Sequence, residues 1–424
     1  MPFWFRSAAD GVSADIVKPV KAVAVRGRIV RTKEITSIGG GASGLMSAIW
    51  AARSGARVTV LEANEKPGKK LLASGNGKCN LTNLAQSPDC YRGSDPAFLW
   101  QIIRQFPAEK TIAFFTGLGL YIKNRDGWVY PYSEQAGAVL NALLMEAEHL
   151  KVKIKTRESV ESVRREDGRF ITRTASWQYE SDAVILACGS PASAVKGSSD
   201  LAVRIADDLD LPFLSFMPAL VPLRIRENYS GRWGGTRAEG AVRLFINGEQ
   251  AAEARGNIQL AGYGISGIPV FQISRFAVRA IRERGDDVRV LMDFFPDCEE
   301  EELLARIRQQ RARCPYQSTR QLLGGMLPEA LVPVIMDTCQ SDEDLVRRIK
   351  RLALTITDAA SGAHAQVSSG GIDTRCLGSD LQVKKLPGFY AAGEAIDADG
   401  TCGGYNLQWA WSSGYTAGVH AAAQ

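Results

Sequence analysis

The sequence predicts an α/β protein in which a domain built on a parallel sheet is interrupted by a β-rich segment and a helical segment. Near the N-terminus, a glycine-rich turn joins a strand candidate to a helix candidate, and a second glycine-rich turn precedes a helix candidate at the C-terminus. Residues 201–265 consist of short apolar runs broken by glycine and proline, which favour strands. Residues 267–350 show the apolar spacing of helices.

The composition is that of a globular protein with a sizeable core. The 424 residues are 45% hydrophobic and 23% charged, and this length is typical of two or three domains. The formal net charge of +5 is a mild excess, so it gives no reason to expect a nucleic-acid partner. No apolar run approaches the roughly 18 residues that a membrane-spanning helix needs. We therefore expect a cytoplasmic protein, and its oligomeric state stays open.

The cysteines and histidines do not predict a metal site. None of the eight cysteines forms a C-x-x-C pair, and the three histidines lie far apart in the sequence. Structural zinc sites and dithiol centres require such close spacing. We expect reduced cysteines and no bound metal.

The glycine-rich turn near the N-terminus has the spacing G-x-G-x-x-G at Gly39, Gly41 and Gly44. A strand candidate at 34–38 precedes it, and a helix and a second strand ending at Glu62 follow. In such a unit the first glycine allows a tight turn, the second lets a pyrophosphate approach the backbone, and the third lets helix and strand pack closely. The Glu62 carboxylate is placed to accept hydrogen bonds from ribose hydroxyls and disfavours a 2′-phosphate. The pattern predicts dinucleotide binding.

The C-terminal segment suggests a ligand longer than NAD. A strand candidate at 389–392 leads into a turn containing Gly400, Gly403 and Gly404, and a helix begins near Tyr405. The N-terminus of a helix offers unpaired N–H groups and a positive partial charge. A flavin ring, which carries negative charge near N1 and O2 when reduced, suits that position. We expect the two remote segments to hold one flavin-containing ligand.

Several longer motifs resemble one family. They are "GKKLLASGNGKCNLTN", "VYPYSEQA", "PALVPL", "GYGISG", "QVSSGGID" and "AGEAIDADGTCGGYNLQWAWSSG". Together, over about residues 34–424, the chain resembles the HI0933-like, or aminoacetone-oxidase-like, FAD-dependent oxidoreductases. The resemblance implies a Rossmann-like FAD-binding domain, split in sequence, with an inserted β-barrel and an inserted helical domain. It implies these boundaries: 1–33, an N-terminal extension; 34–200 and 369–424, the FAD-binding domain; 201–265 and 352–368, the β-barrel; 266–351, the helical insert.

The resemblance also implies a set of FAD contacts. It places Gly39, Gly41, Ala42, Ser43 and Gly44 on the pyrophosphate, Glu62 on the ribose and Val160 near the adenine. It places Lys70, Gly75, Asn76 and Asn80 in a loop beside the cofactor, although the residues alone are equally consistent with a polar surface loop there. Ala187 and Gly189 match an inner turn, and Gly393, Asp397, Asn406 and Leu407 match the contacts to the ribityl chain and ring.

The activity implied by the resemblance is reduction of conjugated C=C bonds in 3-oxo-steroids or 3-dehydro-bile acids at positions 4 and 6. NADH or NADPH would be the electron donor, and the substrate a steroid-like small molecule. Such a reaction needs a hydrogen-bond donor at the developing enolate oxygen and a proton donor at the α-carbon. Tyr132, Tyr263 and Tyr405 are candidates, and packing or cofactor contact is the alternative for each. The alternative functions are an amine oxidase, a plain NAD-dependent dehydrogenase and a non-catalytic FAD-binding module.

Overall fold

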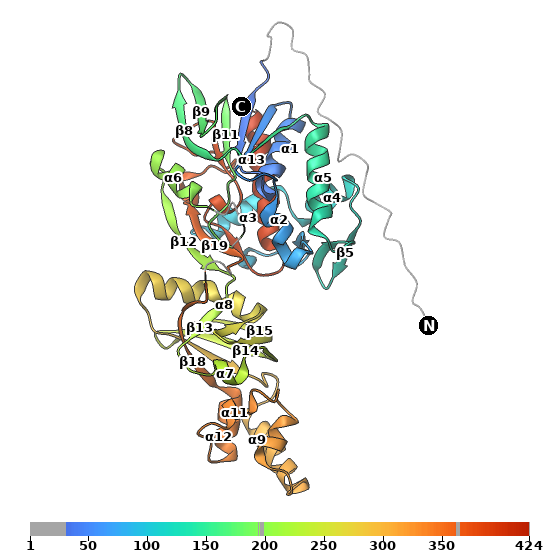
Figure 1. Ribbon diagram of the computed structural model, residues 1–424, viewed down its shortest axis with the longest axis vertical. Helices are drawn as coiled ribbons and strands as arrows, with labels where there is room; N and C mark the ends of the chain where they lie inside the picture. The colour runs from blue at the N-terminus through green and yellow to red at the C-terminus, as the bar shows by residue number, and fades with distance from the viewer. Residues whose placement is uncertain (1–30, 194, 196–198, 362–364, 424) are drawn as a thin grey trace, which may run out of the picture.

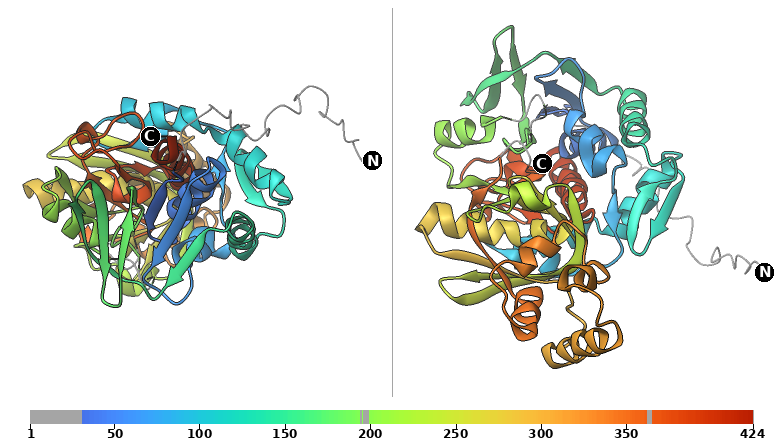
Figure 2. Two further views of the ribbon diagram at one scale, coloured as in Figure 1. Left: turned by 90° about the horizontal axis from the view of Figure 1, so that it is seen from above. Right: turned by 60° about the horizontal axis from the view of Figure 1, so that its bottom comes forward.

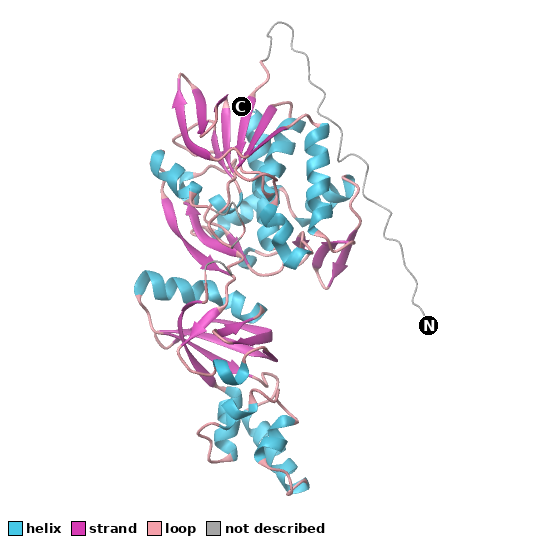
Figure 3. Ribbon diagram, in the orientation of Figure 1, coloured by secondary structure: helices cyan, strands magenta, loops and turns pink. Residues whose placement is uncertain are grey.

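The computed structural model describes residues 31–193, 195, 199–361 and 365–423. The predicted N-terminal extension, 1–33, lies outside these residues except for its last three. The described chain forms an elongated molecule (Figure 1). A body of sheets and helices holds both ends of the described chain, a barrel follows below it, and a group of short helices lies at the far tip (Figure 3).

A five-stranded parallel sheet lies at the centre of the larger body. Its strand order is β20 (Phe389–Ala391), β11 (Ala183–Leu186), β1 (Glu34–Ile38), β2 (Arg57–Glu62) and β7 (Lys153–Thr156). Every neighbouring pair is parallel. All residues of β11 and β20 are buried, as expected for strands that are covered on both faces. Because β20 comes from the C-terminal segment, this domain is split in sequence, as predicted.

The first and last helices pack side by side against this sheet. They are α1 (Ala42–Arg53) and α13 (Tyr405–Ala423), and Figure 2 shows them together in blue and red. A Cβ on Gly414 would lie 2.6 Å from the Ser43 carbonyl oxygen, and one on Gly418 would lie 2.4 Å from that of Ser47. The two helices therefore approach each other so closely that only glycine fits at positions 414 and 418. This contact brings the C-terminal segment onto the N-terminal glycine turn.

Smaller elements surround the parallel sheet. The helices are α2 (Lys69–Ala73), α3 (Pro96–Gln105), α4 (Ala108–Gly117), α5 (Ala136–His149) and α6 (Leu201–Asp208), and short 3₁₀ turns cover Ser74–Gly77, Pro88–Cys90, Thr374–Cys376 and Gly393–Ala395. One antiparallel sheet contains β8 (Val160–Glu166), β9 (Arg169–Thr174) and β10 (Gln178–Ser181), and a second contains β3 (Thr82–Asn83), β5 (Ile122–Arg125) and β6 (Trp128–Pro131). Two further pairs are β4 (Tyr91–Arg92) with β21 (Asp399–Gly400), and β12 (Phe213–Ala219) with β19 (Val367–Ile372).

The second body is a closed six-stranded barrel. Its order is β13 (Leu223–Ile225), β16 (Gly264–Ser266), β15 (Glu249–Ala261), β14 (Thr236–Ile246), β17 (Val288–Asp293) and β18 (Leu352–Ala359). The short helix α7 (Ser230–Trp233) lies beside it, and α8 (Ile268–Arg279), continued by a π-turn at Ala280–Arg284, lies between the barrel and the larger body (Figure 1).

Two details of the inserted region differ from the sequence prediction. The range expected to be helical, 266–351, contains β17, which pairs with β14 and β18 and completes the barrel. Membership of this strand in the barrel is not evident from the sequence, because both of its partners are distant along the chain. The range expected to be barrel, 201–265, begins with α6 and β12, and β12 pairs with β19 outside the barrel.

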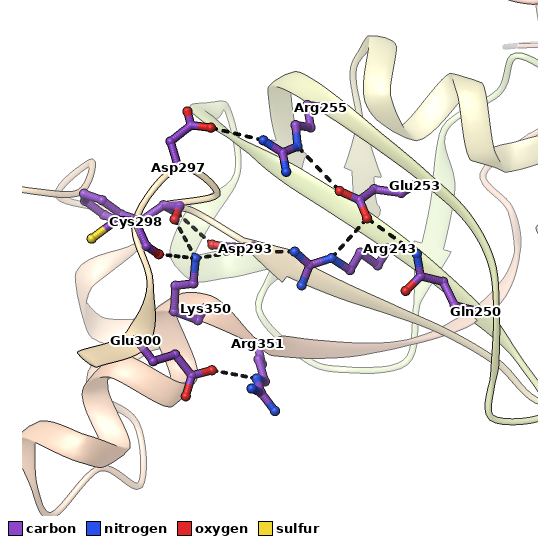
Figure 4. A network of polar contacts seen from close by, with 11 residues as sticks. Arg243, Gln250, Glu253, Arg255, Asp293, Asp297, Cys298, Glu300, Lys350 and Arg351 are labelled. Carbon is purple, nitrogen blue, oxygen red and sulfur yellow. Dashed lines mark hydrogen bonds and ion pairs between the residues drawn. The ribbon is translucent and has the colours of Figure 1, made fainter. Parts of the chain in front are cut away.

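The helices at the tip are α9 (Glu300–Arg313), α10 (Thr319–Gly324), α11 (Val332–Met336) and α12 (Asp342–Lys350). A buried lysine joins them to the barrel (Figure 4). The Nζ of Lys350 donates hydrogen bonds to the carbonyl oxygens of Phe295 at 2.6 Å and Cys298 at 2.7 Å. It also lies 2.8 Å from Oδ2 of Asp293, whose side chain is 2% exposed. The charge of Lys350 is therefore satisfied inside the joint between barrel and helices.

Candidate functional site

A cavity of about 700 Å³ lies where the glycine turn, the C-terminal segment and the start of α8 meet. Of the residues predicted to contact FAD, those that line it are Gly39, Gly41, Ala42, Ser43, Glu62, Lys70, Gly75, Asn76, Asn80, Ala187, Gly189, Gly393, Asn406 and Leu407. Residues from both ends of the chain therefore surround one space, which is the arrangement that the sequence predicts.

The three glycines of the turn have the geometry that dinucleotide binding requires. Gly39 has φ +108°, and a Cβ there would lie 2.4 Å from the Ala187 carbonyl oxygen. A Cβ on Gly44 would lie 1.8 Å from the Gly39 carbonyl oxygen, so this glycine brings α1 close to β1 without lining the cavity itself. Gly41 precedes α1 without a capping side chain, and a Cβ there would meet nothing within 4 Å. The first N–H groups of α1 are thus available to an anion.

Glu62 is held against the glycine turn at the end of β2. Its side chain is buried, and Oε2 accepts a hydrogen bond from the Gly40 N–H at 2.9 Å. Its Oε1 accepts hydrogen bonds from the backbone N–H and the carboxamide of Asn64, at 2.8 and 2.7 Å. Asn64 also lines the cavity, although the sequence reasoning did not single it out. The position of this carboxamide, two residues after Glu62, is the feature of the sequence that could have pointed to it. These residues, Gly39, Gly41, Ser43, Glu62 and Asn64, form the glycine-turn wall.

The loop containing Lys70 and Asn80 folds over the cavity, so the interpretation as a cofactor loop fits this structure better than a free surface loop. Asn80 is 7% exposed, and neither polar atom of its carboxamide has a hydrogen-bond partner within the described part of the chain. A Cβ on Gly404 would lie 2.8 Å from its Oδ1. An unpaired buried amide at the edge of a cavity is expected where a polar ligand completes the site.

An ion pair connects this loop to the C-terminal segment. Nζ of Lys70 lies 2.5 Å from Oε2 of Glu394, which also accepts a hydrogen bond from the Ser190 hydroxyl at 2.9 Å. All three residues line the cavity. These contacts therefore hold together three segments of the cavity wall that are remote from one another in the sequence.

Besides Gly44, two predicted contacts lie outside the cavity lining. Val160 is 2% exposed and packs in the core of the larger body. Asp397 is 1% exposed, and its carboxylate accepts hydrogen bonds from the Ser94 N–H at 2.6 Å and the Gly370 N–H at 3.0 Å. Val160 is therefore a core packing residue in this structure, and Asp397 is hydrogen-bonded within the chain. The carboxamide of Asn406 lines the cavity but is also engaged, because it bonds to both the N–H and the carbonyl of Gly400.

The structure does not bring the predicted catalytic tyrosines to the cavity. Tyr132 is 69% exposed, and Tyr263 is 42% exposed between β15 and β16. Tyr405 is buried, and its hydroxyl donates a hydrogen bond to the Ala85 carbonyl oxygen at 2.8 Å. Tyr130 lines the cavity instead. Tyr132 lies just beyond the end of β6 at Pro131, and its side chain is exposed there instead of facing the cavity.

A second group of lining residues forms an apolar wall. It consists of Trp128, Tyr130, Leu220, Phe271, Val367 and Cys402. Leu220 and Val367 belong to a small hydrophobic cluster against which Phe271 and Cys402 pack. Burial raises the pKa of the Cys402 thiol to about 11, so the thiol is neutral at physiological pH. This wall was not predicted from the sequence, since its members come from five separate segments.

The described residues contain no cluster of His, Cys, Asp and Glu side chains that could bind a metal ion. No helix in the described ranges has the length and apolar character required to cross a membrane.

Comparisons with known proteins agree with this fold. The model of the HI0933-like protein Rossmann domain matches residues 33–420. The chain is 40% identical over 401 residues to the 3-dehydro-bile acid delta(4,6)-reductase of Clostridium scindens, covering 91% of this chain and 98% of that protein. It is 29% identical over 391 residues to the ribosomal RNA dihydrouridine synthase of Escherichia coli, covering 89% and 95%.

A solved structure, the 3-ketosteroid delta1-dehydrogenase of Sterolibacterium denitrificans, has 13% identity and a TM-score of 0.49, with coverage of 92% of this chain and 99% of that one. That likeness is too distant to carry an argument about activity. The family model and the 40% identical relative decide the assignment. The chain belongs to the HI0933-like family, and it is an oxidoreductase with a Rossmann-like FAD-binding domain.

Proposed function

We propose that this protein uses NADH or NADPH to reduce conjugated C=C bonds in 3-oxo-steroids or 3-dehydro-bile acids. One observation carries the proposal: the apolar wall and the glycine-turn wall line the same cavity. An elongated FAD and a flat apolar substrate would thus share one space. The similarity to the Clostridium scindens reductase, which extends over nearly the whole of that protein, supports the substrate class.

The residues of the cavity fit FAD. The open N–H groups before α1 would hold the pyrophosphate, Glu62 the ribose hydroxyls, and the unpaired carboxamide of Asn80 a polar group of the ring or ribityl chain. Gly189 and Gly393 expose backbone where the C-terminal segment meets the glycine turn. Bound FAD would supply hydride transfer between the nicotinamide donor and the substrate.

The apolar wall fits a fused-ring substrate. Trp128, Leu220 and Phe271 offer broad apolar surfaces, and burial of such surfaces contributes about 25 cal/mol per Å². Few polar groups interrupt them, so orientation of the substrate depends on a small number of hydrogen bonds. A 3-oxo group is the polar handle that these conjugated substrates present.

The test is anaerobic reduction of the purified FAD-loaded protein by NADH or NADPH, followed by reoxidation with a steroid 4-en-3-one. The expected result is bleaching of the flavin by one of the two donors and recovery of its absorbance with formation of the saturated 3-ketone. The matched control is the saturated 3-oxo-steroid, which has no bond to reduce. Bleaching by aminoacetone but by neither nicotinamide would favour an amine oxidase and contradict the proposal.

Two further outcomes address the remaining alternatives. A yellow protein that accepts electrons from no donor would favour a non-catalytic FAD-binding module. The absence of a nucleic-acid partner remains a prediction, because one relative is a ribosomal RNA dihydrouridine synthase. Reoxidation by ribosomal RNA lacking dihydrouridine, with none by any steroid, would contradict a steroid substrate.

A further inference from the structure

Tyr130 is the tyrosine of the apolar wall, and the pairing of β6 fixes its direction. Trp128 and Tyr130 are half-buried and line the cavity, whereas Val129 and Pro131 are buried on the opposite face of the strand. A Cβ on Gly403 would lie 3.3 Å from Cζ2 of Trp128. The glycine turn before α13 therefore packs directly against this strand.

The hydroxyl of Tyr130 is not used by the fold. Buried tyrosines elsewhere pair theirs: Tyr91 donates to the Gln86 side chain at 2.6 Å, and Tyr405 donates to the Ala85 carbonyl at 2.8 Å. The Tyr130 hydroxyl makes no hydrogen bond to any described residue. The half-buried hydroxyl retains access to solvent, so it is open to an acceptor on a ligand in the cavity.

The surroundings of Tyr130 keep its phenol protonated. Burial, and then the nearby Cys402 group, raise its pKa, and Glu134 acts in the same direction. Arg125 has the opposite effect, without reversing the shift. A neutral phenol beside apolar side chains donates a hydrogen bond without requiring a countercharge.

We propose that Tyr130 is a catalytic residue whose hydroxyl donates a hydrogen bond to the carbonyl oxygen of the conjugated substrate. The inference rests on the proposed function. A hydride adds to the β-carbon, the C=C electron pair forms a new double bond between the α-carbon and the carbonyl carbon, and the carbonyl pair moves onto oxygen. The O–H of Tyr130 stabilises that oxygen. The α-carbon then takes a proton from water as the carbonyl re-forms, and Tyr130 ends unchanged.

The test compares Tyr130→Phe with Tyr132→Phe. Each variant loses one phenol hydroxyl, and Tyr132 lies outside the cavity with 69% of its surface exposed. We expect Tyr130→Phe to lower kcat for the 4-en-3-one by about 100-fold, the effect of removing one oxyanion donor. Tyr132→Phe should change it by less than about twofold. Reduction of the flavin by the nicotinamide donor should be equal in both variants.

A binding measurement separates this role from a structural one. Binding of a saturated 3-oxo-steroid and of its 3-deoxy counterpart is followed by tryptophan fluorescence, since Trp128 lies in the same wall. Tyr130→Phe should weaken binding of the 3-oxo compound by about fivefold, the value of one neutral hydrogen bond, and leave the 3-deoxy compound unchanged. Equal loss for both compounds would indicate packing and overturn the inference.

The remaining outcomes distinguish the inference from the proposed function. If wild-type protein reduces the 4-en-3-one and Tyr130→Phe retains full kcat, the inference fails while the function stands. Loss of kcat in Cys402→Ala together with full kcat in Tyr130→Phe would assign the role to the thiol and also overturn it. If wild-type protein reduces no steroid, the function fails, and the binding comparison alone decides whether Tyr130 recognises a carbonyl oxygen.

Discussion

Nζ of Lys70 lies 2.5 Å from Oε2 of Glu394, although 324 residues separate the two in the sequence. The pair joins the loop over the cavity to the C-terminal segment, and Ser190 completes it from a third segment. The ion pair is partly exposed, with 33% of the lysine and 16% of the glutamate side chain accessible, so its value for stability is small. The ion pair matters because it fixes the loop over the cavity relative to the C-terminal segment.

Replacing Lys70 should therefore affect ligand binding more than folding. We expect Lys70→Met to weaken FAD binding by about three- to tenfold, because the loop loses one charged contact to Glu394. Titration of the apoprotein with FAD, followed by flavin fluorescence, measures this. Lys66→Met, at an exposed position of the same segment, is the matched control. Equal affinities for the two variants would contradict the prediction.

The geometry of the glycine turn predicts that alanine at position 39 lowers the free energy of unfolding, whereas alanine at position 41 lowers the affinity for FAD. Gly39→Ala should cost about 2–4 kcal/mol of unfolding free energy, because its φ is +108° and a Cβ would overlap the Ala187 carbonyl. Gly41→Ala should leave that free energy nearly unchanged, since a Cβ there meets no atom within 4 Å. It should still weaken FAD binding, because the methyl group would occupy the space of the pyrophosphate. Denaturant unfolding of the apoprotein and FAD titration together test both expectations.

A stable Gly41→Ala protein with undiminished affinity for FAD would place the pyrophosphate elsewhere. A stable Gly39→Ala protein would contradict the geometry of the turn itself.

Asp399 should make stability depend on pH. Burial raises its pKa to about 6, although the Arg275 guanidinium, 2.7 Å away, and Arg92 oppose the shift. The folded state therefore keeps a proton that the unfolded chain releases between about pH 4 and pH 6. This contribution is complete below about pH 4 and is lost as the pH rises through 6, and its upper limit is about 3 kcal/mol.

Asp399→Asn isolates this contribution. We expect the difference in unfolding free energy between wild-type and variant protein to change between about pH 4 and about pH 7, with wild type relatively more stable at the lower pH. Urea denaturation at both values measures it. A difference that is independent of pH would show that the carboxyl group stays ionised beside its two arginines.

The joint between the barrel and the terminal helices contains a matched pair of basic residues. Lys350→Met should destabilise the protein by about 3–5 kcal/mol, because it removes the closer of the two cations that pair with the buried carboxylate of Asp293 and leaves only Arg243, at 3.6 Å. Arg351→Met removes an ion pair to Glu300 in which 61% of the arginine side chain is exposed, so we expect less than about 1 kcal/mol. Chemical denaturation measures both. Similar effects would mean that Lys350 contributes no more than a surface charge.

Much of the nucleotide-binding part could be predicted because it is local in the chain. Gly39, Gly41 and Gly44 lie within one turn, and Glu62 ends the next strand, so strand, turn and helix propensities place them together. The resemblance of longer motifs added the split domain and the two inserts. The N-terminal glycine turn and the C-terminal segment were expected to hold one ligand, and residues of both line the same cavity.

The amino-acid sequence by itself determined the family, the parallel-sheet domain and the glycine turn, because each depends on neighbouring residues or on long motifs. Only the tertiary structure decided that β17 belongs to the barrel and that Tyr130, rather than Tyr132, Tyr263 or Tyr405, lines the cavity. The physical reason is that both outcomes depend on contacts between segments that are distant in the chain: β17 pairs with β14 and β18, and Tyr130 forms a wall with Leu220, Phe271, Val367 and Cys402. Such pairing joins segments that the sequence separates by tens to hundreds of residues.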